Sequence, residues 1–139
     1  MKRLALLCVL CIASIASGAV VAQTPATDTV VTIAETPELG QFLADAEGMT
    51  LYIFTNDEAD SGVSVCNDDC AANWPPFFAD GATLPEGVSG ELTVITHDDG
   101  SGQLAYNGLP LYYWVQEMAP GDTTGHEVGD VWFEAAVGE

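Results

Sequence analysis

Two cysteines lie outside the N-terminal segment of this chain, and their spacing is compatible with disulfide or redox chemistry. Cys66 and Cys70 are separated by three residues. A helical turn brings such a pair within disulfide distance, whereas a strand holds it too far apart. Acidic neighbours and the absence of a nearby cation disfavour the low thiol pKa that a redox-active cysteine needs. We therefore expect a structural disulfide at a turn or helix start, with a thiol redox pair or metal thiolates as alternatives.

Histidine is the next residue type that could bind a metal. His97 and His126 are the only two in the chain, and Glu127 is not followed by the second histidine of a zinc-protease helix. With Met49 and Met118 they leave a copper site as an alternative. Met49 occupies an apolar position of a strand pattern, which favours ordinary core packing.

Acidic residues are concentrated in turns. The turn acids that could bind calcium are Asp57, Glu58, Asp60, Asp98 and Asp99. Carboxylate oxygens on turns suit Ca²⁺, but neither cluster has the spacing of an EF-hand loop. We expect a solvated acidic shell that keeps the protein soluble, with specific calcium binding as the alternative.

The charge balance excludes several functions. The 139 residues include 2 Lys+Arg and 21 Asp+Glu, for a formal net charge of −19. Both basic residues, Lys2 and Arg3, lie at the N-terminus, so the rest of the chain has none. This excludes a basic nucleic-acid surface, a P-loop lysine and an arginine clamp for phosphate. The 48% apolar share and the length indicate one folded domain.

The first 22 residues predict a secretory signal. Lys2 and Arg3 form the positive start, residues 4–15 are apolar, and a V-x-A cleavage site ends at Ala22. A transmembrane anchor would need a longer uninterrupted apolar run. We expect removal of residues 1–22 and export to the periplasm or the exterior, without a membrane span in the mature protein. Residues 23–34 are expected to be a spacer and the first strand.

The mature chain contains an internal repeat. Residues 48–57 align with residues 108–117, sharing a glycine, a Leu-Tyr pair, a further aromatic residue and a terminal acid. A tryptophan follows each copy. The motif residues are Tyr52, Phe54, Asp57 and Trp74 in the first copy and Tyr112, Trp114, Glu117 and Trp132 in the second. We predict one domain, 35–139, made of two pseudo-repeats at about 39–79 and 91–135.

The local patterns predict strands and one helical turn. Alternation places Tyr52 and Phe54 on one sheet face and Leu51 and Ile53 on the other, so both faces are apolar. Strands are also expected near 39–45, 91–97, 103–106 and 109–115. The one helical candidate, 68–74, is stopped by two prolines. The predicted fold class is mainly β, with two related β-hairpin-rich halves packed as one small domain and one short helical turn near the disulfide.

Asp57 and Glu117 recur at the end of each motif strand. We expect each to cap backbone N–H groups of the following turn, with a ligand role as the alternative. The aromatic motif residues are expected to be mostly core, although some of them suit a groove for a sugar or a partner.

These motifs resemble a family of bacterial secreted repeats and predicted lipoproteins of unknown function that carry a Y-x4-D motif. Tyr52 to Asp57 fits that motif, and Tyr112 to Glu117 is a second copy with Glu for Asp. The cysteine segment that ends in Trp-Pro-Pro and the residues near 106–112 and 120–133 are also similar. The resemblance covers roughly 35–135 and implies an exported repeat protein. No lipobox precedes the early cysteines, in contrast to a lipid-anchored member.

The sequence predicts a secreted acidic module that binds a ligand or associates with the envelope, without catalytic residues. No cofactor is expected, apart from the calcium alternative. The expected partner is a protein, a glycan or a component of the cell envelope, and not a nucleic acid. A calcium-dependent binder and a thiol redox protein are the alternative functions.

Overall fold

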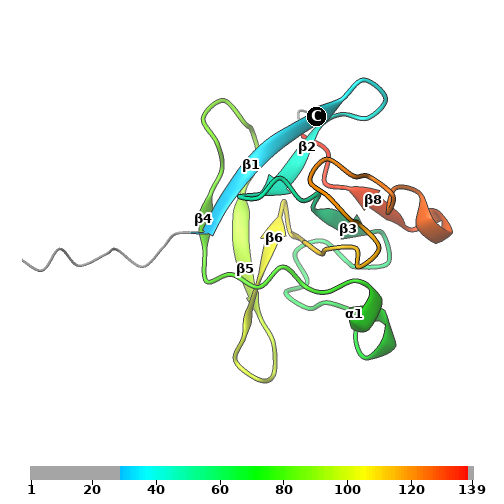
Figure 1. Ribbon diagram of the computed structural model, residues 1–139. Coiled ribbons are helices and arrows are strands. Elements are labelled where there is room, and N and C mark those ends of the chain that lie inside the picture. The colour runs from blue at the N-terminus through cyan, green and yellow to red at the C-terminus, as the bar shows by residue number, and fades with distance from the viewer. Residues whose placement is uncertain (1–28, 138–139) are drawn as a thin grey trace, which may run out of the picture.

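The computed structural model describes residues 29–137, and the predicted signal segment lies outside them. The first half opens with β1 (Thr29–Thr36) and β2 (Gly40–Asp45), which pair antiparallel as a hairpin. A short strand, β4 (Ala82–Thr83), adds to the other edge of β1 in parallel. Figure 1 shows this hairpin in blue and cyan, away from the turn that joins β5 and β6.

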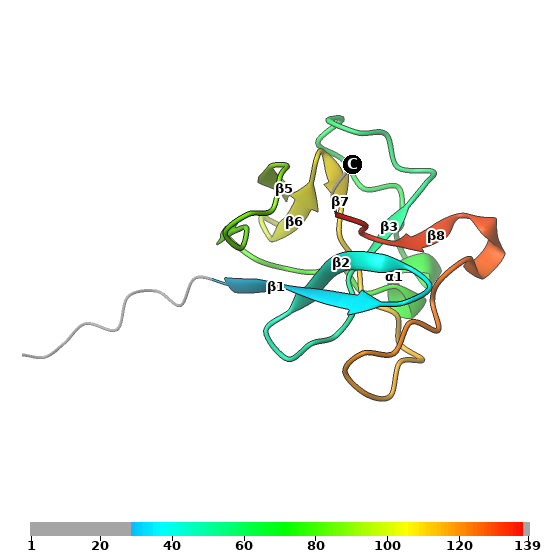
Figure 2. The same cartoon turned by 90° about the horizontal axis from the view of Figure 1, so that it is seen from above.

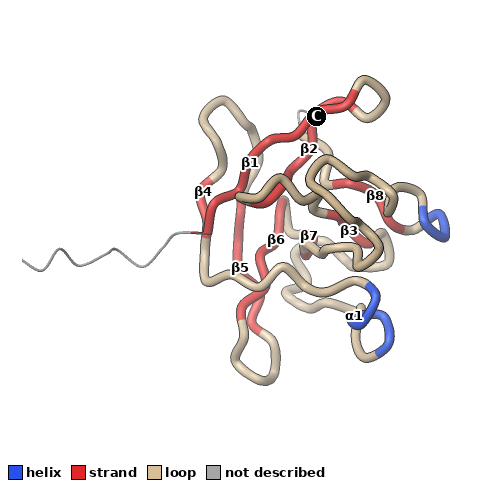
Figure 3. Tube along the Cα trace, viewed as in Figure 1, coloured by secondary structure: helices blue, strands red, loops and turns tan. Residues whose placement is uncertain are grey.

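The second half has a corresponding hairpin. β5 (Leu92–Thr96) pairs antiparallel with β6 (Gly102–Tyr106), and β7 (Leu109–Pro110) lies beside β6. The hairpins belong to separate sheets, as the view from above shows (Figure 2). Loops make up much of the remaining chain, and helix is confined to α1 (Asp69–Asn73) and a 3₁₀ turn, η1 (Val128–Asp130), among residues 29–137 (Figure 3). The predicted mainly β fold with one short helical turn is confirmed.

One predicted strand is wrong in length. The ladder expected over 109–115 ends at Pro110, and Tyr112 instead forms isolated bridges to Tyr52 and to Pro76. Pro110 has no N–H to donate, and after it the chain pairs with residues 75–77, through hydrogen bonds from Phe77 N–H to Leu111 O and from Tyr113 N–H to Pro75 O. The chain here therefore lies between two partner segments and does not extend one ladder.

The two halves exchange their last segments. β8 (Trp132–Glu134), from the second half, pairs antiparallel with β3 (Tyr52–Phe54) of the first. Conversely, Phe77 of the first half donates its N–H to Leu111 O at 2.9 Å in the second half. Between these pairings, Tyr52 and Tyr112 exchange two backbone hydrogen bonds of 2.8 and 2.9 Å. The halves are thus joined by main-chain pairing and form one unit.

The motif strands are buried on both faces, as their alternation predicted. Leu51 and Leu111 belong to one buried cluster, together with Val31, Leu43, Phe77 and Leu104. Tyr52 and Tyr112 belong to the other, which also contains Phe54, Trp74 and Trp132. Since period-two alternation sends successive side chains to opposite faces, each motif strand contributes to both clusters.

Candidate functional site

Four motif aromatics stack into a single column. Phe54 lies on Trp132 with ring centroids 4.2 Å apart, Trp132 on Trp74 at 3.8 Å, and Trp74 on Trp114 at 4.0 Å. We call these four rings the aromatic column. The two central tryptophans, one from each half, are nearly parallel, with an angle of 4° between their ring planes. The column is therefore centred on the contact between the halves.

The two motif tyrosines flank the column edge-on. Tyr52 meets Trp74 at 5.5 Å and 78°, and Tyr112 meets Trp132 at 5.1 Å and 90°. Edge-to-face contacts place the positive rim of one ring against the negative face of the other, and are favourable beyond their buried area. The relation repeats in both halves, which indicates a pseudo-twofold arrangement.

The motif acids pair with the tyrosine of the opposite repeat. Tyr112 donates its hydroxyl hydrogen to Asp57 Oδ2 at 2.6 Å, and Tyr52 donates to Glu117 Oε1. We call these two contacts the crossed pairs. Both carboxylates are buried, at 6% and 9% exposure. All eight motif residues singled out in the sequence thus meet in one region, across the join between the halves.

The crossed pairs give the two acids a contact that the sequence interpretation did not include. Asp57 also accepts the N–H of Val65 at 2.8 Å, in the loop that follows its strand. Its two oxygens therefore serve a backbone donor and a tyrosine from the other repeat. Asp57 donates its N–H to Phe54 O, so the chain turns directly after β3, and the strand pattern alone does not show which tyrosine each acid meets.

Aromatic donors partner every buried acid among residues 29–137. The other two are Asp45, which accepts from the Tyr113 hydroxyl at 2.8 Å, and Glu134, which contacts His126 Nδ1. No lysine or arginine exists outside residues 2 and 3 to neutralise these acids. The protein therefore buries carboxylates against phenols and an imidazole.

Burial without a fixed cation changes the titration of the crossed pairs. Desolvation raises the pKa of Glu117 to about 7, although the hydrogen bond from Tyr52 partly opposes it. Burial likewise raises the pKa of Asp57 above its ordinary value, opposed by the Tyr112 hydroxyl and the Val65 N–H. Burial and then the adjacent carboxylate raise the pKa of Tyr52 and Tyr112, so both phenols stay protonated as donors.

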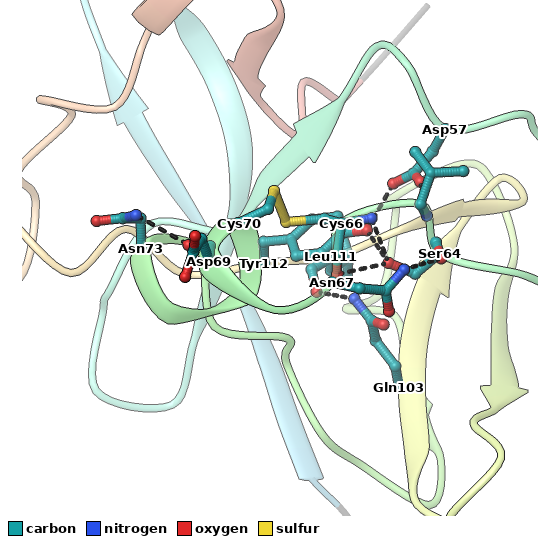
Figure 4. The surroundings of a disulfide bond; sticks show 11 residues. Asp57, Ser64, Cys66, Asn67, Asp69, Cys70, Asn73, Gln103, Leu111 and Tyr112 are labelled. Atoms are coloured by element: carbon teal, nitrogen blue, oxygen red, sulfur yellow. Dashed lines mark hydrogen bonds between the residues drawn. A yellow bond between two sulfur atoms is a disulfide. The ribbon is translucent and has the colours of Figure 1, made fainter.

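The predicted disulfide is confirmed and supports one side of this centre. Cys66 and Cys70 are bonded, with Cα atoms 5.1 Å apart. Cys66 is buried in the cluster of the motif aromatics and donates its N–H to Ser64 Oγ at 3.2 Å. Ser64 Oγ in turn lies 2.5 Å from the Tyr112 hydroxyl. The bridge therefore fixes the loop that reaches one crossed pair (Figure 4). Cys70 also lies in α1, which ends next to Trp74.

The calcium candidates are divided between different environments. Asp57 is buried against Tyr112, whereas Glu58 and Asp60 are exposed in the loop after β3. Asp98 and Asp99 lie in the β5–β6 turn, where Asp99 accepts two hydrogen bonds from Ser101. Across residues 29–137, no three His, Cys, Asp or Glu side chains gather in a group that could hold a metal ion.

A small pocket lies beside His97, and none of the four rings of the aromatic column lines it. Its volume is about 170 Å³, and it is lined by residues 62–64, by Asn67 and by residues 95–98. Its walls come from the loop after β3 and from the end of β5. We call it the His97 pocket. It combines apolar side chains, including Val63 and Ile95, with the polar side chains of His97, Asn67 and Asp98.

Comparison with known proteins supports the repeat. Residues 34–77 and 93–136 each match the family described as a secreted repeat of unknown function. No curated protein and no solved structure matches the chain. None of the helices within residues 29–137 is long and apolar enough to cross a membrane.

Proposed function

The chain belongs to this family of secreted repeats, and we propose that it is an exported, non-catalytic module that binds a positively charged partner. The observation that carries the proposal is its charge distribution. All 21 acids lie in a chain whose only two basic residues belong to the predicted signal. Four of those acids are buried and partnered by aromatic donors, while most of the others are exposed to solvent.

Such a surface favours one class of partner on physical grounds. A large uncompensated negative charge attracts a basic partner at long range and raises its association rate. The same field repels nucleic acid and anionic lipid, and gives no advantage to a neutral glycan. Among the partners considered from the sequence, we therefore prefer a basic protein or another cationic component of the envelope.

The motif residues are better suited to a framework than to catalysis. The carboxylates of Asp57 and Glu117 are buried, and each accepts a hydrogen bond from a tyrosine hydroxyl. A general acid or base must reach the proton that it transfers in a bound substrate. These groups instead join the two halves, and we assign the binding of a partner to the exposed surface of the protein.

The two alternative functions have weaker support. A dithiol function would use Cys66, which is 1% exposed, so direct attack on this sulfur is hindered. A calcium function would need turn acids that converge, and the candidates are divided between the loop after β3 and the β5–β6 turn. For the compartment, we propose the periplasm or the cell exterior.

The test is a calorimetric titration of the chain lacking residues 1–22 with hexalysine, at low and at physiological salt. We expect binding that weakens as salt rises, because screening shortens the range of the attraction. Hexaglutamate is the control and should not bind. Hexalysine that binds no better than an uncharged Gly-Ser hexapeptide at low salt would overturn the proposal.

A further inference from the structure

The His97 pocket occupies a place where the two halves differ. Phe42 of β2 forms an isolated bridge to Ala136, and Gln103 of β6 forms the matching bridge to Phe78. Phe42 and Gln103 therefore hold corresponding positions, and both are completely buried. The first half fills this position with an apolar ring, whereas the second fills it with a polar amide.

A buried amide is costly unless both ends are hydrogen-bonded. Gln103 Nε2 donates to Leu111 O at 2.8 Å, and Gln103 Oε1 lies 2.8 Å from His97 Nε2. Because the amide oxygen can only accept, this network assigns the proton of His97 to Nε2. The buried glutamine thereby fixes the ring and the tautomer of a histidine that lines the pocket.

The other ring nitrogen is left as an open acceptor. Within residues 29–137, His97 Nδ1 has no hydrogen-bond partner, and no buried side-chain nitrogen or oxygen lacks one. Nδ1 must therefore be accessible to solvent. Nearby, the exposed carboxylate of Asp98 adds a negatively charged acceptor to the same pocket wall.

Apolar side chains adjoin these acceptors. Val63 lines the pocket and is 60% exposed, and the buried Ile95 contributes to the opposite wall. Phe78 is 54% exposed and meets the His97 ring edge-on at 5.8 Å. Exposed apolar groups therefore lie next to hydrogen-bond acceptors, and few side chains match both chemistries.

We propose that the His97 pocket receives a lysine or arginine side chain of a positively charged partner, an inference that rests on the function proposed above. The aliphatic stem of such a side chain packs on Val63 and Ile95, and its head donates hydrogen bonds to His97 Nδ1 and Asp98. Lysine and arginine combine an apolar stem with a head that only donates. Charge complementarity to a chain whose only lysine and arginine are residues 2 and 3 selects this occupant over a neutral sugar.

The experiment maps hexalysine onto the chain by ¹H–¹⁵N NMR titration and compares two matched pairs of variants. Asp98→Asn removes one charge from the pocket, and Glu38→Gln removes one from the β1–β2 turn, the corresponding turn of the other half. Val63→Ser removes the apolar wall, and Val115→Ser alters another exposed valine outside the pocket. All four positions are exposed, so the variants are expected to fold.

We expect chemical-shift changes centred on residues 62–67 and 95–98. The Kd of Asp98→Asn for hexalysine should be about threefold higher than that of Glu38→Gln, the effect expected from losing one exposed ion pair. Val63→Ser should weaken binding while Val115→Ser does not. Equal losses within each pair, with shifts spread over the surface, would overturn the pocket and leave the proposed function standing. A complete absence of hexalysine binding by the unaltered chain would overturn both. Pocket shifts with a neutral disaccharide but not with hexalysine would also refute the assignment.

Discussion

Replacing Glu117 by glutamine should abolish the pH dependence that this buried carboxyl gives to the free energy of unfolding. The folded chain holds the pKa of this carboxyl at about 7, against an ordinary value of 4.5. Between these values the unfolded chain releases the proton that the folded chain keeps, so the free energy of unfolding falls as pH rises. Below the lower value Glu117 is protonated in both states, and above the upper value it is ionised in both, so its contribution is constant outside this window.

The magnitude follows from the width of the accessible window. From pH 5 to pH 7 the folded state retains roughly one proton more than the unfolded state. At about 1.4 kcal/mol per pH unit, the titration of Glu117 lowers the free energy of unfolding by about 3 kcal/mol between pH 5 and pH 8. Glutamine stays neutral throughout and still offers Tyr52 an amide oxygen, so Glu117→Gln should not show this loss.

The assay is urea unfolding of both proteins from pH 5 to pH 8 at fixed ionic strength. The wild-type curve should fall relative to the Glu117→Gln curve by about 3 kcal/mol, with most of the change before pH 7. Glu58→Gln, an exposed acid in the loop after β3, is the matched control and should run parallel to wild type. A difference between wild type and Glu117→Gln that does not depend on pH, or a wild type that gains stability as pH rises, would refute the reasoning.

Two further predictions concern the disulfide and the turn acids. Replacing Cys66 and Cys70 together by alanine should lower the free energy of unfolding by about 2 kcal/mol, the loop-closure value for so short a loop. Urea unfolding measures this loss, and an unchanged midpoint would contradict a stabilising role for the disulfide. Millimolar calcium and NaCl of matched ionic strength should raise the thermal midpoint equally, because both only screen the acidic surface. A calcium-specific gain, which would approach about 2.7 kcal/mol at a hundredfold excess over Kd, would instead identify a site.

The sequence was informative where a local rule decides the outcome. Alternation through Leu51, Tyr52, Ile53 and Phe54 correctly assigned each side chain to one of two buried clusters, because the period of a strand leaves no other choice. The spacing of Cys66 and Cys70 correctly predicted a bridge at a helix start, because a disulfide cannot span an extended strand.

The features that depend on pairing between distant segments were not predictable in the same way. Tyr52 and Asp57 recur together, so the sequence alone does not say which acid each tyrosine meets. The pairing of β8 with the first half, and of residues 75–77 with the second, places each tyrosine next to the acid of the opposite repeat. The His97 pocket was missed for a related reason, because nothing local shows that Gln103 takes the buried position that Phe42 fills in the first half.

The central claim, that each motif tyrosine is bonded to the acid of the opposite repeat, is tested most directly by double-mutant cycles of unfolding free energy at pH 8. The cycles combine Tyr→Phe at 52 or 112 with an alanine replacement at 57 or 117. The account predicts coupling of about 1–2 kcal/mol for Tyr52 with Glu117 and for Tyr112 with Asp57, and less than about 0.5 kcal/mol for the pairs within one repeat. Coupling within each repeat and none across them would contradict it.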